Sequence, residues 1–157
     1  MNDTSNPLPQ YEAVPLQTAA EREAVFAIRM TVFVEEQDVP PEEELDAYDV
    51  TAAHFLARII AAPTPSGIVG TARLLDKGHG VGKIGRVAVL REYRGKGIGA
   101  LLMRRIEQDA RAAGYTELIL EAQCYAIPFY EKLDYIAEGD IFLDCNIEHR
   151  LMRKSLS

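Results

Sequence analysis

The hydrophobic positions of this chain change spacing several times, from alternation or short apolar runs to a helical period and back. Strands are predicted where apolar residues alternate or run together, over residues 11–17, 54–61, 68–75, 84–90, 116–122, 135–138, 141–143 and 148–153. Helices are predicted where they recur three and four apart, over residues 18–34, 97–113 and 126–133. This order predicts a mixed α/β protein of the α+β type, with hairpins at one end and crossovers at the other.

Local signals mark the ends of several of these elements. Thr18 followed by Glu21 forms a capping-box pattern at the start of the first helix, and Gly114 is placed to end the long one. Residues 84–90 are almost continuously apolar, as expected of a central buried strand. Residues 35–49 are acidic and contain two adjacent prolines, which predicts an irregular or short-helical connection.

The composition is ordinary for one globular domain. The chain has 157 residues, 48% hydrophobic and 26% charged, so we expect a flexible tail over 1–10 and a single domain over 11–157. The net charge of −7 argues against nucleic-acid binding and mildly favours an amine partner. Neither a membrane span nor a signal-peptide pattern is visible, so we expect no membrane contact and a cytoplasmic location. Cys124 and Cys145 are then expected to be reduced thiols.

A glycine-rich basic turn between a strand and a helix is the strongest chemical signal. It reads RGKGIG over residues 94–99, directly before the amphipathic segment 97–113. Free backbone N–H groups and the helix dipole make such a helix start an anion site. The glycines allow positive φ and close backbone approach, and Arg94 and Lys96 add positive charge. We therefore expect the pyrophosphate of a coenzyme to bind here.

Two other nucleotide-binding patterns fit this turn less well. The phosphate-binding loop of nucleotide triphosphatases fails, because no Gly-Lys-Ser/Thr follows at the required distance. Gly95, Gly97 and Ala100 formally satisfy the dinucleotide-binding fingerprint, with Glu121 at the end of a following strand. That fold begins with its glycine turn, however, and here most of the chain precedes it.

A family resemblance extends on both sides of the turn. Arg94, Gly97 and Gly99 match the Q/R-x-x-G-x-G/A loop of the GNAT superfamily of acetyl-CoA-dependent N-acetyltransferases. The stretch IGRVAVLREYRGKGIGALLM over 84–103 resembles that family's central strand, loop and helix, and AIPFYEKLDY over 126–135 resembles a second family segment. The resemblance implies a central, mostly antiparallel twisted sheet of about six or seven strands, splayed at the central pair and flanked by about four helices.

The N-terminal half of the chain indicates one particular branch of this superfamily. The stretch RMTVFVEEQDVP over 29–40, followed by Glu43, Asp46, Asp49 and His54, resembles the ElaA/YjcF-like branch of the superfamily. The resemblance therefore covers residues 20–153. It implies transfer of an acetyl group to a primary amine of a small molecule or peptide, by direct attack in a ternary complex.

The resemblance also implies roles for individual residues. Backbone groups near Val87, Ala88 and Val89 are expected to pair with the pantetheine arm of the coenzyme, as an added strand would. The predicted pyrophosphate site consists of Arg94, Gly95, Lys96, Gly97, Ile98, Gly99 and Ala100. Tyr130 matches the position of a tyrosine general acid, and Glu121 that of a glutamate base.

The residues that would bind the acceptor amine are predicted less specifically. Arg29, Phe33, Glu35 and Glu36 lie on the segment that borders the acceptor pocket in this fold, and Glu35 or Glu36 could relay a proton through water in place of Glu121. We expect no metal site, because the spacing of the histidines and acidic residues matches no ligand motif. Asp46, Asp49 and His54 are candidates for a structural network instead.

Two departures from the family pattern bear on the site. Asp134 stands where the family's segment usually has glycine, and aspartate tolerates the left-handed backbone that such a turn needs. The link Gln123–Tyr125 lacks the asparagine that many members place near pantetheine. The alternative hypothesis is a catalytically inactive acyl-CoA-binding sensor on the same scaffold. A homodimer that pairs through the closing strands is a further expectation.

Overall fold

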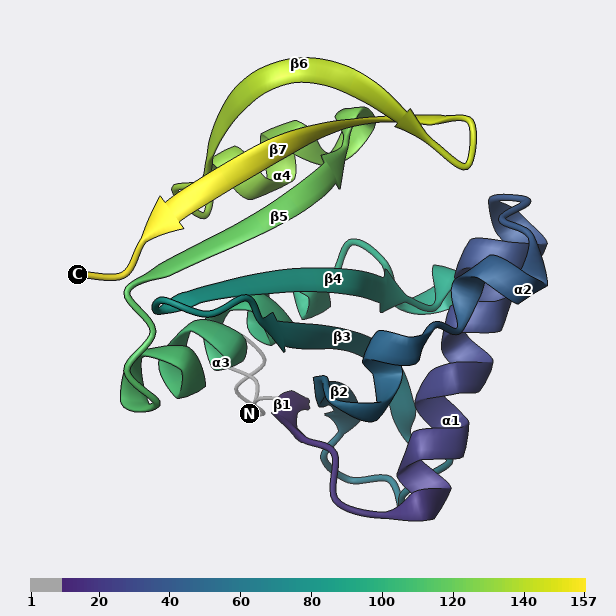
Figure 1. The fold of residues 1–157 in the computed structure, drawn as a ribbon. Helices are drawn as coiled ribbons and strands as arrows, with labels where there is room; N and C mark the ends of the chain where they lie inside the picture. Colours follow the sequence, from purple (N-terminus) through teal and green to yellow (C-terminus); the bar gives the residue numbers. More distant parts are fainter. Residues whose placement is uncertain (1–9) are drawn as a thin grey trace, which may run out of the picture.

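The computed structural model of the chain describes residues 10–157, and nearly all of the predicted N-terminal tail lies outside that range. The strands are β1 (Tyr11–Pro15), β2 (Ala53–Ile59), β3 (Ile68–Asp76), β4 (Val81–Val89), β5 (Glu117–Gln123), β6 (Ile136–Asp144) and β7 (Ile147–Ser155). They form one seven-stranded sheet in the order β1-β2-β3-β4-β5-β7-β6 (Figure 1). The central pair β4 and β5 is parallel and every other pair is antiparallel, which confirms the predicted fold class.

Helices cover both faces of the sheet. The α-helices are α1 (Ala19–Arg29), α2 (Pro41–Glu44), α3 (Ile98–Ala112) and α4 (Ile127–Glu131), and the short 3-10 turns are η2 (Ala47–Val50), η3 (Arg91–Tyr93) and η4 (Cys124–Ala126). Phe55 and Ala57 of β2 pack in the same core cluster as α3, whereas Leu56 between them packs with α1. Alternate residues of a strand point to opposite faces, so the two helices lie on opposite sides of the sheet.

The first helix starts as the sequence predicts and then changes its winding. Thr18 accepts a hydrogen bond from the Glu21 N–H at 3.1 Å, and the Glu21 carboxylate accepts one from the Thr18 N–H at 3.1 Å. This reciprocal capping box confirms the predicted start. Beyond Arg29 the chain continues as a π-helix, η1 (Met30–Glu36), where the apolar spacing predicted an ordinary helix. Such segments are rare and often occur at functional sites.

The central strands β4 and β5 separate after four paired positions. Pairing of β4 with β5 ends at Ile84 opposite Leu120, while β5 stays paired with β7 up to Gln123. On its other side β4 contains a β-bulge at Arg86, which has a φ of 55°. A bulge bends its strand and increases the local twist. The second half of β4 therefore turns away from β5, and the sheet is splayed at its centre as predicted (Figure 1).

The closing strands differ from the prediction. The sequence predicted two short strands over 135–138 and 141–143, but the structure has one strand, β6, with a register shift between Glu138 and Phe142. Gly139 adopts a φ of 76° there, so the glycine that interrupts the alternation accommodates a bulge and does not end the strand. As the sheet edge, β6 exposes the apolar side chains of Ile136, Ile141 and Leu143. Within residues 10–157, no helix has the length and apolar character needed to cross a membrane.

Candidate active site

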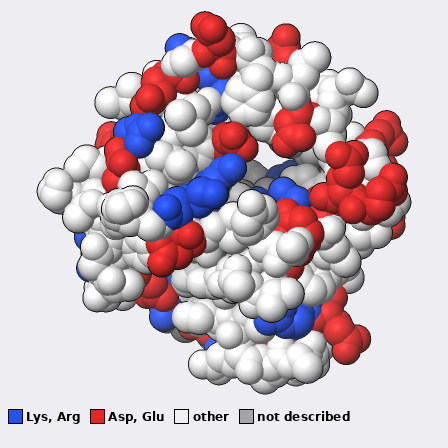
Figure 2. Space-filling model, in the orientation of Figure 1, with Lys and Arg blue, Asp and Glu red and all other residues white. Residues whose placement is uncertain are grey.

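A cleft of about 550 Å³ opens where β4 and β5 separate. Its walls come from η1, the segment from α2 to η2, β3, β4, the end of β5, η4, α4 and the β6–β7 turn with the start of β7. Figure 2 shows this hollow near the middle of one face, with acidic side chains grouped to one side of it over α2. The cleft thus joins the segments that the sequence assigns to coenzyme and to acceptor.

The splayed half of β4 presents backbone groups to this cleft. The Leu90 N–H donates to the Val69 carbonyl of β3 at 2.9 Å, and Thr71 of β3 pairs with Ala88. Because backbone groups alternate sides along a strand, those of Val87 and Val89 point to the side that β5 has left. Ala88, in contrast, directs its backbone to β3 and contributes its buried side chain. An extended ligand can therefore pair with two of the three predicted residues.

The glycine turn has the form of an anion site. Gly97 is the N-cap of α3 with a φ of 80°, Gly95 has a φ of 77°, and no side chain caps the helix. The N–H groups of the first turn therefore have no intrahelical partner. A Cβ at Gly95 or Gly97 would meet no atom within 4 Å, so positive φ is the reason for glycine at both positions. Gly99 has a different cause, since a Cβ there would lie 3.1 Å from the Phe129 ring.

Arg94 is held beside this turn by two contacts. Its Nε donates to the Val89 carbonyl at 2.9 Å, and its Nη2 pairs with Glu36 at 2.7 Å. The Arg94 side chain remains 43% exposed, and Lys96 in the same turn is exposed too. Glu36, predicted on the acceptor side, does not line the cleft and instead orients the arginine of the coenzyme side.

Tyr130 lines the cleft from α4 and is only 8% exposed. Its ring meets Phe129 and Tyr135 edge to face, at centroid distances of 4.9 and 6.2 Å. Burial raises the pKa of the Tyr130 hydroxyl well above its ordinary value, and the nearby Tyr125 adds to this. The hydroxyl therefore stays protonated at neutral pH. Within the described part of the chain, no hydrogen-bond partner is found for it.

The acceptor candidates fall in different places. Phe33 of η1 lines the cleft, and so does Glu121 of β5, whose carboxylate pairs with Lys83 at 3.0 Å and is 40% exposed. Glu35 is exposed and does not line the cleft. Arg29 does not reach the cleft either. Its side chain is 1% exposed, with Nε on Glu44 at 2.7 Å and Nη1 on Asp49 at 2.7 Å. The prediction of Arg29 as a substrate contact is therefore replaced by a structural role.

Arg29 belongs to a network that fixes the segment 41–50 to the sheet. Arg73 of β3 pairs with Asp46 at 2.7 Å and Asp49 at 2.8 Å, and Arg86 at the β4 bulge pairs with Glu44 at 3.1 Å. Three arginines thus offset three carboxylates. The Arg73 hydrogen bond holds the pKa of Asp46 below its usual range. Burial opposes the ionisation of Asp49, but its hydrogen bonds to Arg29 and Arg73 still hold its pKa low.

This network confirms the structural grouping expected for Asp46, Asp49 and His54. The His54 ring nitrogen Nε2 lies 2.9 Å from the Asp49 carbonyl oxygen, which can only accept, so that nitrogen is the donor. The sequence did not reveal Arg73 and Arg86 as partners. A charged residue inside an almost continuously apolar strand is the signal that points to such a buried pair.

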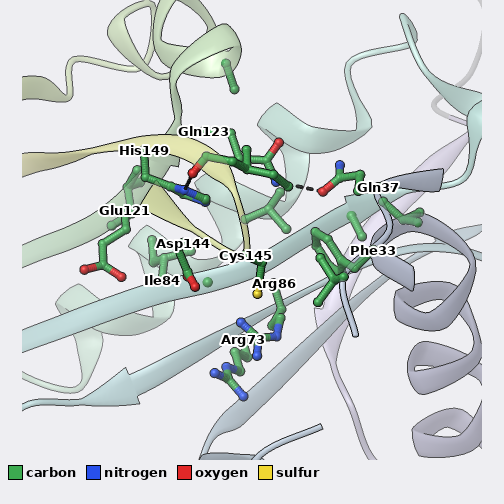
Figure 3. A pocket seen from close by; sticks show the side chains of 18 of the residues that line it. Phe33, Gln37, Arg73, Ile84, Arg86, Glu121, Gln123, Asp144, Cys145 and His149 are labelled. Atoms are coloured by element: carbon green, nitrogen blue, oxygen red, sulfur yellow. Dashed lines mark hydrogen bonds between the residues drawn. The ribbon is translucent and has the colours of Figure 1, made fainter. Parts of the chain in front are cut away.

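Other cleft residues also went unpredicted. Gln123 donates to Gln37 at 2.8 Å, which links the end of β5 to the end of η1 across the cleft (Figure 3). Asp144, Cys145 and His149 reach it from the β6–β7 turn and β7. All of these residues come from segments distant in sequence from the glycine turn.

The departure at Asp134 is resolved by the structure. Asp134 has a φ of 74°, so aspartate occupies the left-handed turn expected where the family has glycine.

The family model described as "Acetyltransferase (GNAT) family" matches residues 22–135 of this chain. The chain belongs to this family. A Bacillus subtilis protein, the uncharacterized N-acetyltransferase YjcF, is 35% identical over 144 residues, covering 91% of this chain and 99% of the relative. The family and this relative identify the chain as an acetyltransferase. The family also implies that the cosubstrate is an acyl-CoA.

Solved structures agree on the fold. An acyl-CoA N-acyltransferase from Pseudomonas aeruginosa is 30% identical with a TM-score of 0.77, covering 92% of this chain and 97% of that chain. ElaA of Escherichia coli has the same TM-score of 0.77 at 24% identity, covering 92% of this chain and 98% of that one. The resemblance to YjcF is therefore confirmed by sequence, and the resemblance to ElaA is confirmed for the fold.

Proposed function

We propose that this acetyltransferase uses acetyl-CoA and acetylates a primary amine of a small molecule or peptide, by direct attack in a ternary complex. One observation carries the proposal. The part of β4 that has separated from β5, with the backbone of Val87 and Val89 facing the cleft, is followed after the 3-10 turn η3 by the glycine turn that starts α3. A long ligand with an amide-containing arm and a pyrophosphate would find partners for both along this track.

The residues present suit such a ligand. The Val87 backbone and the Val89 N–H would pair with the amides of the arm, since the Val89 carbonyl already accepts from Arg94. The first amides of α3, residues 98–100, would hold the pyrophosphate, with Arg94 and Lys96 supplying charge. A backbone N–H of β4 at the splay would also lie near the thioester carbonyl, where negative charge develops during attack.

Proton transfer falls to the side chains that line the cleft. Tyr130 is protonated, buried and free of hydrogen-bond partners within residues 10–157, so we assign it the protonation of the leaving thiolate. The acceptor must lose a proton before it attacks, because a free alkylammonium has a pKa of about 10. Glu121, the glutamate that the resemblance implies as base, lines the cleft in an ion pair with Lys83, and Phe33 supplies an apolar wall.

The activity itself is tested by amine-dependent release of the CoA thiol from acetyl-CoA. The panel should contain diamines, arylalkylamines, amino acids and peptides with free N-termini or lysines, with mass spectrometry of the products. We expect at least one amine to gain a single acetyl group and to release thiol stoichiometrically. Tight acetyl-CoA binding with no turnover across the panel would contradict the proposal and favour the inactive sensor.

A further inference from the structure

The proposed reaction needs a group that takes a proton from the acceptor ammonium, and the glutamate predicted for this role is already engaged. The Glu121 carboxylate pairs with the Lys83 ammonium at 3.0 Å and is 40% exposed. We propose that the general base of this acetyltransferase is His149, acting through its Nε2 atom. The inference rests on the proposed function and assigns a residue to one of its steps.

His149 stands at the right place in the sheet. It lies on β7, directly opposite Gln123 at the end of β5 and opposite Phe142 of β6. Residues directly opposite on paired strands share a face, so the imidazole projects to the same side as Gln123. Both side chains line the cleft, and Figure 3 shows His149 beside Gln123 on the same wall. Glu121 and Tyr130 line this cleft too.

The surroundings of His149 fix its tautomer. Nδ1 lies 2.7 Å from the Ile147 carbonyl oxygen, which can only accept a hydrogen bond, so Nδ1 must carry the hydrogen. A neutral imidazole then has its lone pair on Nε2. The ring is stacked on Phe142 at 5.8 Å with an interplanar angle of 22°, which restrains its plane. Nε2 thus has the electronic form that a base needs.

Within residues 10–157 the contact of Nδ1 is the one hydrogen bond of the imidazole, so the Nε2 lone pair is left open to the cleft although the residue as a whole is only 9% exposed. A buried imidazole with one nitrogen anchored and the other free at a cleft is arranged as in other enzymes that hold a histidine base by its Nδ1. Its position therefore calls for a proton donor from the ligand.

Several charged or titratable groups share this wall and bear on the step. They are Glu121 of β5, Tyr125 of η4, Asp144 and Cys145 of the β6–β7 turn, and Lys83 and Arg86 across the cleft on β4. Lys83 is neutralised by Glu121, and Arg86 by Glu44 and Asp46. Asp144 lines the cleft and has no ion-pair partner within the described residues, so its charge favours an incoming ammonium.

The step balances with the groups named. The acceptor ammonium gives one proton to His149 Nε2, and the freed nitrogen lone pair forms the bond to the thioester carbonyl carbon. The carbon–sulfur bond then breaks with its electron pair on sulfur. The thiolate gains a proton from Tyr130, and the second proton, which the nitrogen loses as the amide forms, restores the Tyr130 hydroxyl. His149 returns its proton to solvent, so one proton is released for each acetyl group transferred.

The test compares pH profiles of kcat/KM for the parent and for His149→Asn. The asparagine amide can still donate to the Ile147 carbonyl but cannot accept a proton. A general base must be unprotonated to act, so the kcat/KM of the parent should fall towards low pH. In the variant we expect about a hundredfold lower kcat/KM at neutral pH, loss of this acidic limb, and unchanged acetyl-CoA affinity.

Controls separate chemistry from structure. His79→Asn serves as the matched substitution, because His79 is exposed in the β3–β4 turn, has a φ of 56° that asparagine tolerates, and does not line the cleft. Imidazole added to His149→Ala should restore part of the lost rate, whereas a structural defect would not respond. If His149→Asn keeps the parent rate and acidic limb, or if imidazole rescues nothing, His149 is not the base. An inactive parent would overturn the proposed function instead.

Discussion

Replacing Tyr130 by phenylalanine is expected to lower kcat by about a hundredfold while leaving acetyl-CoA affinity within about twofold of the parent value. The substitution removes one hydroxyl and keeps the ring that packs edge to face on Phe129 and Tyr135. No hydrogen-bond partner is found for that hydroxyl within residues 10–157, so the fold loses no hydrogen bond with it. The loss should therefore appear in turnover and not in stability.

Activity should nevertheless persist in this variant. Holding the amine against the thioester replaces a bimolecular encounter, and this contribution does not depend on the acid. Tyr115→Phe is the matched control, because Tyr115 does not line the cleft, and it should keep full turnover. The turnover of both variants is measured at saturating substrate concentrations, together with a test of whether chemistry limits the rate. Turnover equal to the parent, with chemistry rate-limiting, would remove Tyr130 as the acid.

Replacing Arg29 by methionine is expected to lower the free energy of unfolding by about 3–5 kcal/mol. Arg29 is 1% exposed, and its loss would leave the buried carboxylates of Glu44 and Asp49 short of a partner. The guanidinium uses three nitrogens, since Nη2 also donates to the Glu44 carbonyl at 2.8 Å and to Asp49 at 3.0 Å. Lysine cannot reproduce this geometry, so the free energy of unfolding of Arg29→Lys should also lie well below that of the parent.

Urea denaturation measures this effect directly. The matched control is Arg58→Met, because Arg58 pairs with Glu12 across β1 and β2 through a contact of 2.7 Å while remaining 34% exposed. Surface pairs contribute between about 0 and 1 kcal/mol, so the control should stay close to the parent. A similar loss of unfolding free energy in both variants would show that the contribution of Arg29 to stability does not depend on the burial of its network.

Features that depend on residues only a few positions apart were predictable from the sequence. The capping box of Thr18 and Glu21, the glycine turn before α3 and the left-handed Asp134 each depend on neighbours within a few residues. The family resemblance then supplied the topology, including the splay of β4 from β5. These features rest on backbone geometry and local hydrogen bonds, which leave a readable pattern in the chain.

Features that join distant segments were not predictable in the same way. Glu36 and Arg29 have charges suited to an acceptor pocket, yet pairing with Arg94 and with Glu44 gives both residues other roles. His149 lies 26 positions beyond Gln123 and meets it only because β5 and β7 pair. Side-chain partners across a sheet depend on register, and sequence spacing alone does not specify the register of separate strands.

Calorimetric titration of acetyl-CoA tests the central claim most directly. We expect the parent to bind with a dissociation constant on the order of micromolar, and Arg94→Glu to bind at least tenfold more weakly. Arg104→Glu makes the same charge change on the exposed side of α3 and should bind like the parent. Free nucleotide and dephospho-CoA serve as ligand controls. No binding by the parent, or equal binding by Arg94→Glu, would contradict the assignment of the splayed strand and glycine turn to the coenzyme.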